Sequence, residues 1–231
     1  PEHPELLDRL ALSLLEKQWN LKAFIKEIVL SRTYRQATLP EENFYSFQVA
    51  RRLPAEFVRD NTLAISGLLV PKIGGPSVKP FQPPGYYRHL NFPRRVYKQD
   101  TGDTQWRRGL YVHWQRQFLH PMMKAFDAPS REECTTQRPQ SNTPLAALVL
   151  LNDPTFLEAA KAFAQKIIVH GGASFQSRVS YAFEEAVSRS PDSFEQETLA
   201  QLLIDTKSNS PDMWTPVARA ILNLAETNLR R

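Results

Sequence analysis

Two acids in one loop, with a histidine upstream, are the residues of this sequence that could do chemistry. Asp127 and Glu133 lie in the stretch "FDAPSREECTTQRPQS", and His113 lies in "YVHWQRQFLHP". A pair of carboxylates can hydrolyse a glycosidic bond, and a histidine can transfer protons near neutral pH. Two acids in a loop are not specific to hydrolysis, however. Asp127, Glu133 and His113 are therefore weak candidates for catalysis, and the pattern alone assigns no reaction.

Cys134 is the only cysteine of the chain. A cysteine nucleophile needs a base, and no histidine is adjacent to Cys134 in the sequence, so a small buried thiol is the favoured interpretation. A single cysteine also excludes an internal disulfide. Because the chain has no CxxCH motif, it cannot itself attach a c-type haem.

Arg131 and Arg138 lie in the same loop and allow two interpretations. A guanidinium offers a planar fork of donors that suits a carboxylate or a sulfate, so the two residues could bind an anionic ligand. Alternatively, one of them pairs internally with Asp127, Glu132 or Glu133 and holds an irregular segment in place. Internal pairing is the favoured interpretation, and ligand binding stays the alternative.

A basic and aromatic segment carries the net charge of the chain. Residues 86–138 contain 10 Lys and Arg against 5 Asp and Glu, whereas the rest of the chain contains 19 of each. A local basic excess can attract phosphate, sulfate, carboxylate or nucleic acid. If this segment binds a ligand, its aromatic side chains are expected to stack on sugars while the two loop arginines bind anionic groups. Those aromatic residues are Tyr86, Tyr87, Trp106, Tyr111 and Trp114. The alternative is a half-buried packing layer.

Three histidines of this segment, His89, His113 and His120, lack the i, i+4 spacing of a helical zinc site, so no metal site is assigned.

A second group of charges lies near the start of an expected helix. It consists of Arg51, Arg52, Glu56, Arg59 and Asp60. These residues are expected to form a charge network there, with neutralisation of an anionic ligand as the alternative.

The composition indicates a globular, mostly helical protein. Of 231 residues, 42% are hydrophobic, and the chain has 8 glycines against 18 prolines. Few glycines argue against a sheet rich in hairpins, and many prolines favour ordered loops and sharply started helices. No apolar run reaches the roughly 18 residues of a membrane helix, and no signal peptide opens the chain. Because it begins at "PEHPELLDRLA", already helical in pattern and without a methionine, it is expected to be part of a longer protein.

The apolar periodicity predicts helices at both ends and irregular structure between them. Thr143 and Asp153 are expected N-caps, each followed by a proline at the first helical position, and Asn20 is a third N-cap. The other expected helices span residues 4–18, 55–69, 107–118, 175–189, 193–206 and 213–229. We expect a single mostly helical domain of residues 1–231. Within it, residues 1–70 form N-terminal helices, residues 71–142 an irregular basic aromatic insert, and residues 143–231 a C-terminal helical bundle.

Several motifs occur in the order found in one known family. They are "HPELLDRLA", "WNLKAFIKEIVLSRTYRQ", "RRLPAEFVRDNTLAISGLL", "GGPS", "FDAPSREECTTQRPQSNTPLAALVLLNDPTFLEAA" and "RSPDSFEQETLAQLL". Together they resemble the domain of unknown function numbered 1553, which occurs in large exported planctomycete and verrucomicrobial proteins. The resemblance covers nearly the whole chain.

The resemblance implies a context rather than a reaction. Such proteins usually carry a cytochrome c-like domain upstream, so a c-type haem is expected only in a part of the protein that precedes this chain. Family genes commonly lie near sulfatases and polysaccharide-processing enzymes, which implies a periplasmic or otherwise exported protein. The implied partners are upstream domains of the same polypeptide and, as ligands, anionic glycans.

Three classes of function follow. The favoured one is a non-catalytic structural or ligand-binding module of an exported, cytochrome c-associated protein in a polysaccharide-processing system. The second is a catalytic domain of a carbohydrate-active hydrolase or oxidoreductase, which requires the candidate acids to converge in a cleft. The third is a nucleic-acid-binding module. It is disfavoured because the basic segment lacks a recognisable nucleic-acid-binding motif and because export is implied.

Overall fold

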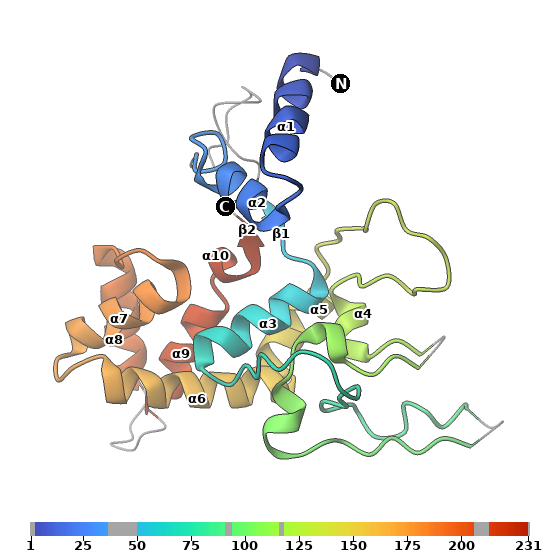
Figure 1. The fold of residues 1–231 in the computed structure, drawn as a ribbon. Helices are drawn as coiled ribbons and strands as arrows, with labels where there is room; N and C mark the ends of the chain where they lie inside the picture. Colours follow the sequence, from blue (N-terminus) through green and yellow to red (C-terminus); the bar gives the residue numbers. More distant parts are fainter. Residues whose placement is uncertain (1–2, 37–49, 91–93, 116–117, 206–212, 231) are drawn as a thin grey trace. The chain divides into compact units, whose positions relative to one another are not determined.

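The computed structural model describes residues 3–36, 50–90, 94–115, 118–205 and 213–230. The chain divides into two compact units, one of residues 1–51 with residue 231 and one of residues 52–230. We call them unit 1 and unit 2. Helices dominate both units, so the predicted mostly α class is confirmed (Figure 1). No helix in the described part of the chain is both long enough and apolar enough to cross a membrane.

The described residues of unit 1, 3–36 and 50–51, include two helices, α1 (Pro4–Glu16) and α2 (Leu21–Leu30). Asn20 caps α2 as predicted, because its side chain accepts a hydrogen bond from the Ala23 amide at 3.1 Å. The apolar side chains of α2 are only partly buried. Ile25, for example, is 55% exposed. Unit 1 therefore leaves much of its apolar surface open to solvent.

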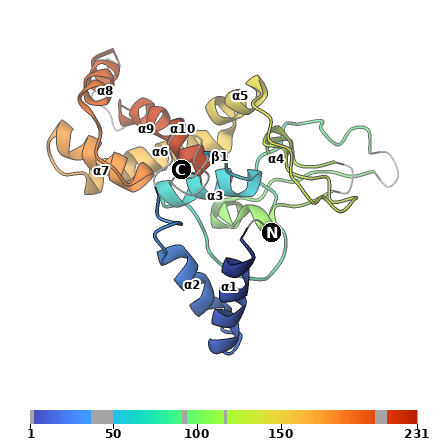
Figure 2. The ribbon, with the colours of Figure 1, turned by 90° about the horizontal axis from the view of Figure 1, so that it is seen from above.

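Unit 2 is built around its longest helix, α6. The helices α3 and α9 pack along α6, while α7 and α8 lie at one end of the unit and the irregular insert at the other (Figures 1 and 2). The α-helices of unit 2 are α3 (Ala55–Ser66), α4 (Pro121–Ala125), α5 (Pro144–Asn152), α6 (Pro154–His170), α7 (Phe175–Val187), α8 (Ser193–Asp205), α9 (Trp214–Leu222) and α10 (Ala225–Asn228). The short elements are β1 (Arg51–Arg52), η1 (Gly102–Trp106), η2 (Gly109–Tyr111) and β2 (Leu229–Arg230).

The described residues of unit 2 form two apolar clusters, one among its C-terminal helices and one between helices and the irregular insert. The first joins α6, α7 and α9, and it includes the fully buried Phe163 and Phe183. The second joins α3 and α4 to the insert, and it includes Val58 and Met123. The second cluster is what anchors the irregular segment to the helices.

Both helix starts predicted in the second half are confirmed. The Thr143 side chain accepts from the Ala146 amide at 3.3 Å, and the Asp153 carboxylate accepts from the Thr155 amide at 2.8 Å. A proline follows each cap at the first helical position. Caps depend on a few adjacent residues, which is why the sequence predicts them well.

The single helix predicted for residues 213–229 is wrong, because α9 ends at Leu222 and α10 begins at Ala225. The Thr227 hydroxyl donates to the carbonyls of Leu222 and Leu224 at 2.8 and 2.7 Å. A threonine that binds nearby carbonyls competes with helical backbone hydrogen bonds. The helix is interrupted between Leu222 and Ala225, beside the carbonyls that the Thr227 hydroxyl binds.

The short helix predicted for residues 107–118 is also wrong. In the described part of this segment, residues 107–115 and 118, the helical structure is limited to the 3-10 turn η2, and after η2 Val112 pairs as an isolated bridge with Val78. Gly109 passes so close to α3 that a Cβ atom there would lie 2.9 Å from Glu56 Cα. Contact with α3 and the bridge to Val78 therefore set the backbone of this segment. No pattern in the sequence predicts the short helix α4, which begins at Pro121.

Two buried arginines, Arg59 and Arg107, hold the irregular insert in position by hydrogen bonds to its backbone carbonyls. The Arg107 guanidinium donates to three carbonyls within residues 72–76, among them Pro76 at 2.6 Å. The Arg59 guanidinium, only 1% exposed, donates to the carbonyls of Gln105 and Arg107 at 2.6 and 2.5 Å. Burial lowers the pKa of Arg59 to about 10, so it stays a cation at neutral pH. These contacts satisfy carbonyls that neither helix nor sheet satisfies.

Candidate functional site

Asp127 is fixed by donors from Ser141, at the far end of its loop, and from Arg52 of β1. Its carboxylate accepts hydrogen bonds from the Ser141 amide at 2.7 Å, the Ser141 hydroxyl at 2.8 Å and the Arg52 guanidinium. Partial burial opposes ionisation, but these donors outweigh it and lower the pKa of Asp127 below its usual value. The ionised carboxylate of Asp127 thus holds the two ends of the loop together through its hydrogen bonds to Ser141.

Glu56 is the partner of both loop arginines. Arg138 lies 2.7 Å and Arg131 4.0 Å from its two carboxylate oxygens. The guanidinium of Arg131 also lies over the Trp114 ring, 3.8 Å from its centroid. Both loop arginines therefore form ion pairs within the protein. The partner is an acid of α3 rather than Asp127 or its loop neighbours.

Three of the aromatic residues that were predicted to stack on a ligand form hydrogen bonds with the backbone of the protein itself. Tyr86 donates through its hydroxyl to the Leu119 carbonyl at 2.9 Å, and the Tyr111 hydroxyl accepts from the Gly74 amide at 2.7 Å. The indole of Trp114 donates to the Ser130 carbonyl at 3.0 Å.

Tyr87 corrects the expectation of an open stacking surface. It is only 8% exposed, and its ring packs edge-on against Tyr97 and Phe118. Burial raises the pKa of Tyr87. Trp106 is half-buried. The aromatic residues therefore serve mainly as packing for the insert, because the insert has few aliphatic residues with which to build a core.

The remaining candidates do not gather into one centre. His113 is half-buried with Nδ1 3.4 Å from the Ser77 hydroxyl, and Glu133 is exposed. No hydrogen bond or ion pair among the described residues joins Asp127, Glu133 and His113 to one another. Cys134 is exposed, which overturns the expected buried thiol. The loop that carries it projects from unit 2 instead of packing on it (Figure 1).

His120 is buried and neutral. Its side chain is 2% exposed, and Nε2 lies 2.8 Å from the Phe81 carbonyl. Burial lowers the pKa of His120 to about 4. Because a ring nitrogen that faces a carbonyl must carry the proton, Nε2 is the donor at neutral pH. His120 therefore fastens the insert to α4, which begins at the next residue.

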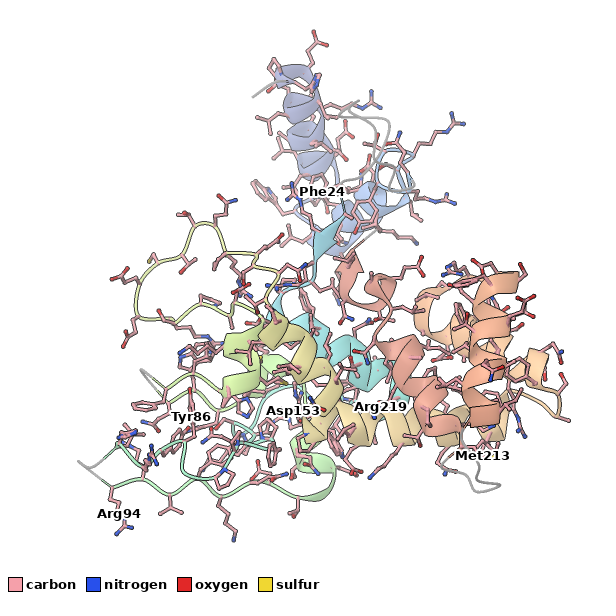
Figure 3. The ribbon with its side chains drawn as sticks, turned by 180° about the vertical axis from the view of Figure 1, so that it is seen from behind. Phe24, Tyr86, Arg94, Asp153, Met213 and Arg219 are labelled. Atoms are coloured by element: carbon pink, nitrogen blue, oxygen red, sulfur yellow. The ribbon has the colours of Figure 1, made fainter. Side chains whose placement is uncertain are left out.

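The insert forms a hollow of about 550 Å³ that the sequence did not single out. Residues 79–90 and 94–100 run out and back beside each other, joined by hydrogen bonds between Lys79 and Asp100. Figure 3 shows Tyr86 near the helices and Arg94 towards the outer end of this pair of segments. The lining residues are Gln82, Pro83, Pro84, Gly85, Tyr86, Tyr87, Arg88, Leu90, Arg94, Arg95, Val96 and Tyr97. We call it the arginine hollow.

The arginine hollow carries positive charge without compensation from its own walls. Arg88, Arg94 and Arg95 line it, and none of its lining residues is acidic. All three arginines are exposed, and no carboxylate of the described residues forms an ion pair with them. The sequence signal was present in "PPGYYRHLNFPRR". It was missed because charge counting over residues 86–138 did not show which arginines are already paired.

A second hollow of about 640 Å³ runs along α3. Its walls are mostly apolar, with Phe57 and Leu110 58% and 64% exposed, and Glu56 and Arg138 also line it. Its charged residues include both signs, so it has no preference for an anion comparable with that of the arginine hollow.

Among the residues that the structure describes, no three His, Cys, Asp or Glu side chains are grouped so that they could hold a metal ion.

Comparison with known proteins places the chain in a family. Neither the curated proteins nor the solved structures give a match. A family model described as PSD1, protein of unknown function (DUF1553), matches residues 1–203. This match covers most of the 231 residues and agrees with the ordered motifs of the sequence. The chain therefore belongs to the PSD1 family of proteins of unknown function (DUF1553).

Proposed function

We propose that this chain is a non-catalytic, ligand-binding module of an exported, cytochrome c-associated protein that takes part in processing complex polysaccharides. Its ligands are anionic glycans, and its partners are upstream domains of the same polypeptide. The exported and polysaccharide context comes from the family resemblance of the sequence motifs. The non-catalytic role comes from the geometry of the candidate acids.

The state of Asp127 is the observation that carries the proposal. A general acid in glycoside hydrolysis needs a raised pKa, so that it holds a proton at neutral pH. The donors around Asp127 instead lower its pKa, and they occupy both carboxylate oxygens. Glu133, its potential partner, lies exposed in the projecting loop. Asp127 and Glu133 therefore do not form an acid pair in a cleft that excludes water.

Unpaired positive charge in the insert supports the ligand-binding part of the proposal. Arg131 and Arg138 share Glu56, whereas the arginine hollow has three cations and no acid in its walls. An anionic group bound by such arginines gains charge-assisted hydrogen bonds, which are stronger than those between neutral groups.

Incubation with neutral and sulfated oligosaccharides, followed by mass spectrometry of the products, tests the non-catalytic role. We expect the oligosaccharides to be recovered intact. A cleaved or oxidised product that disappears in Asp127→Asn or Glu133→Gln would establish catalysis and overturn the proposal. The Lys161→Ala variant, changed at an exposed position of α6, controls for a contaminating enzyme, because its preparation should behave as wild type does.

A further inference from the structure

The hollow along α3, which we call the α3 hollow, has a volume of about 640 Å³. Sites that bind small organic ligands have volumes of roughly 300–1,000 Å³ and mostly apolar walls with a few polar groups. Four charged residues line the α3 hollow, and two of them, Glu56 and Arg138, neutralise each other at 2.7 Å. The other two, Asp60 and Arg108, are therefore the charges that the hollow offers to a ligand.

Asp60 uses only one of its two carboxylate oxygens within the described part of the chain. Its Oδ1 accepts a hydrogen bond from the Gly109 amide at 2.6 Å and lies 3.8 Å from the Arg59 guanidinium. Its Oδ2 has no hydrogen-bond partner among the described residues, and it is open to solvent rather than enclosed. Burial raises the pKa of Asp60, so a cationic donor that reached Oδ2 would stabilise the ionised carboxylate.

Arg108 lies on the segment that Asp60 holds against α3. Gly109 approaches this helix so closely that a Cβ atom there would lie 2.9 Å from Glu56 Cα. The residues on either side of it, Arg108 and Leu110, both line the hollow. Arg108 is exposed, and no ion pair or hydrogen bond joins its side chain to the residues that the structure describes. Its positive charge opposes the rise in the pKa of Asp60, which shows that the two charged groups are near each other.

Apolar side chains line most of the rest of the α3 hollow. They belong to Leu53, Pro54, Phe57, Ala64, Leu69 and Leu110. Phe57 and Leu110 are more than half exposed, so a ligand that covers them removes apolar surface from water. A sugar ring suits such walls poorly, because its hydroxyl groups would lose water without gaining hydrogen-bond partners.

Three chemical demands therefore define the ligand. Arg108 requires an anionic group, Asp60 requires a donor that is preferably cationic, and the walls require an apolar body. A fatty acid lacks the donor, and an apolar amine lacks the anion. A free amino acid with an apolar side chain meets all three demands, since its carboxylate and its ammonium are attached to the same carbon atom.

We propose that the α3 hollow binds a free α-amino acid with an apolar side chain. Its carboxylate pairs with Arg108, its ammonium donates to Asp60 Oδ2, and its side chain packs on the apolar walls. This site goes beyond the proposed function, because its ligand is a zwitterion rather than an anionic glycan and its residues are not those of the arginine hollow. Either proposal can therefore fail without the other.

Titration of the purified chain, followed by NMR to detect weak binding, tests the site with four probes. Phenylalanine carries all three groups, whereas phenethylamine lacks the carboxylate, hydrocinnamate lacks the ammonium and glycine lacks the apolar body. We expect phenylalanine to bind about fivefold or more tightly than each of the other three. Absence of phenylalanine binding, or another probe that binds as tightly as phenylalanine, would contradict the proposal.

Two substitutions separate the charged contacts. Arg108→Gln should weaken phenylalanine and hydrocinnamate about fivefold or more and leave phenethylamine unchanged, because only the first two carry a carboxylate. Asp60→Asn keeps an acceptor oxygen for the Gly109 amide. It should weaken phenylalanine and phenethylamine and leave hydrocinnamate unchanged.

The matched control is Arg95→Gln, which removes an exposed arginine of the arginine hollow and should leave every affinity unchanged. Because Arg108 is exposed, its variant should keep the fold. An unchanged phenylalanine affinity in Arg108→Gln, or an equal loss in the control, would overturn the assignment. Equal losses of all probes in both Arg108→Gln and Asp60→Asn would also overturn it, because they would not follow the charged groups.

Phe57→Ala tests the apolar contact. It should weaken phenylalanine, phenethylamine and hydrocinnamate alike, by about threefold or more, because all three lose the same apolar wall. Ile73→Ala, at another exposed apolar residue, should weaken none of them. Unchanged affinities in the Phe57 variant would contradict the proposal.

Discussion

The guanidinium of Arg138 lies 2.7 Å from the carboxylate of Glu56, which belongs to the first turn of α3. The other oxygen of Glu56 lies 4.0 Å from Arg131, whose guanidinium covers the Trp114 ring. One acid of a helix thus anchors two arginines of a loop that has neither helix nor strand. The two arginines that the sequence suggested as ligand-binding residues therefore already have an acidic partner within the protein.

Glu56→Gln should loosen this loop and destabilise unit 2 modestly. Both arginines are about 40% exposed, so solvent screens their ion pairs, and we expect the free energy of unfolding to fall by only about 1 kcal/mol. Urea unfolding measures the change. Glu132→Gln removes an exposed acid of the loop itself and should change stability by less. Equal effects of the two variants would contradict the anchoring role of Glu56.

Asp127→Asn should cost about 1–2 kcal/mol of unfolding free energy at neutral pH, because it removes a charge that three donors stabilise. Asparagine tolerates the left-handed backbone of this position, where φ is +58°, so the variant isolates the charge. The lowered pKa means that this contribution is present above pH about 3.8 and is lost as the pH falls below that value. Urea titrations at several pH values measure the difference, with Glu133→Gln as the control. A difference that stays constant into strong acid would exclude the carboxylate as its cause.

His120 should make the protein acid-sensitive. In the unfolded chain its pKa is near 6.5, whereas burial lowers the folded value to about 4. The unfolded state therefore binds the proton first, and stability should fall from about pH 6.5 down to pH 4, by at most about 1.4 kcal/mol per pH unit from this residue. His120→Gln keeps an amide donor near Phe81 but does not titrate, so it should flatten the slope. The exposed His89→Gln variant should keep it. A slope that is equally steep in both variants would assign the acid sensitivity to other groups.

Arg107→Lys should free the insert while leaving the helices folded. A lysine cannot reach the three carbonyls of residues 72–76 that the guanidinium binds, so those groups would lose their donors. Limited proteolysis should then cut residues 71–90 several-fold faster than in wild type. The neighbouring Arg108 is exposed, and Arg108→Lys should leave the rate unchanged. Equal protection of all three proteins would show that other contacts hold the insert.

The parts of the fold that the sequence predicts are those set by adjacent residues. The helix starts at Thr143 and Asp153 depend on a cap and the proline after it, and both occur as expected. The break after Leu222 was missed because it depends on hydroxyl contacts of Thr227 that compete with the helix only once the turn has formed.

The insert and its site could be predicted only in part, because distant residues decide them. Glu56 and Arg138 are 82 positions apart, and no local pattern links them. Tyr86 and Tyr87 likewise look equivalent in the sequence, but they differ in solvent exposure: Tyr86 is half-buried and Tyr87 is buried. The count of charges locates the basic excess within residues 86–138. It could not identify Arg88, Arg94 and Arg95 as the arginines without an acidic partner, because that depends on the pairing of all the others.

The thermal unfolding of the chain with neutral and sulfated oligosaccharides, at low and at high salt, tests the account most directly. A ligand that binds only the folded state raises the melting temperature, and attraction by net charge alone is screened by salt. We predict a rise of a few degrees, on the order expected for about 1 kcal/mol of binding, with sulfated but not neutral oligosaccharides, and we predict that it survives high salt. Absence of a shift with every oligosaccharide, or a shift that vanishes at high salt, would contradict a preformed site for anionic glycans.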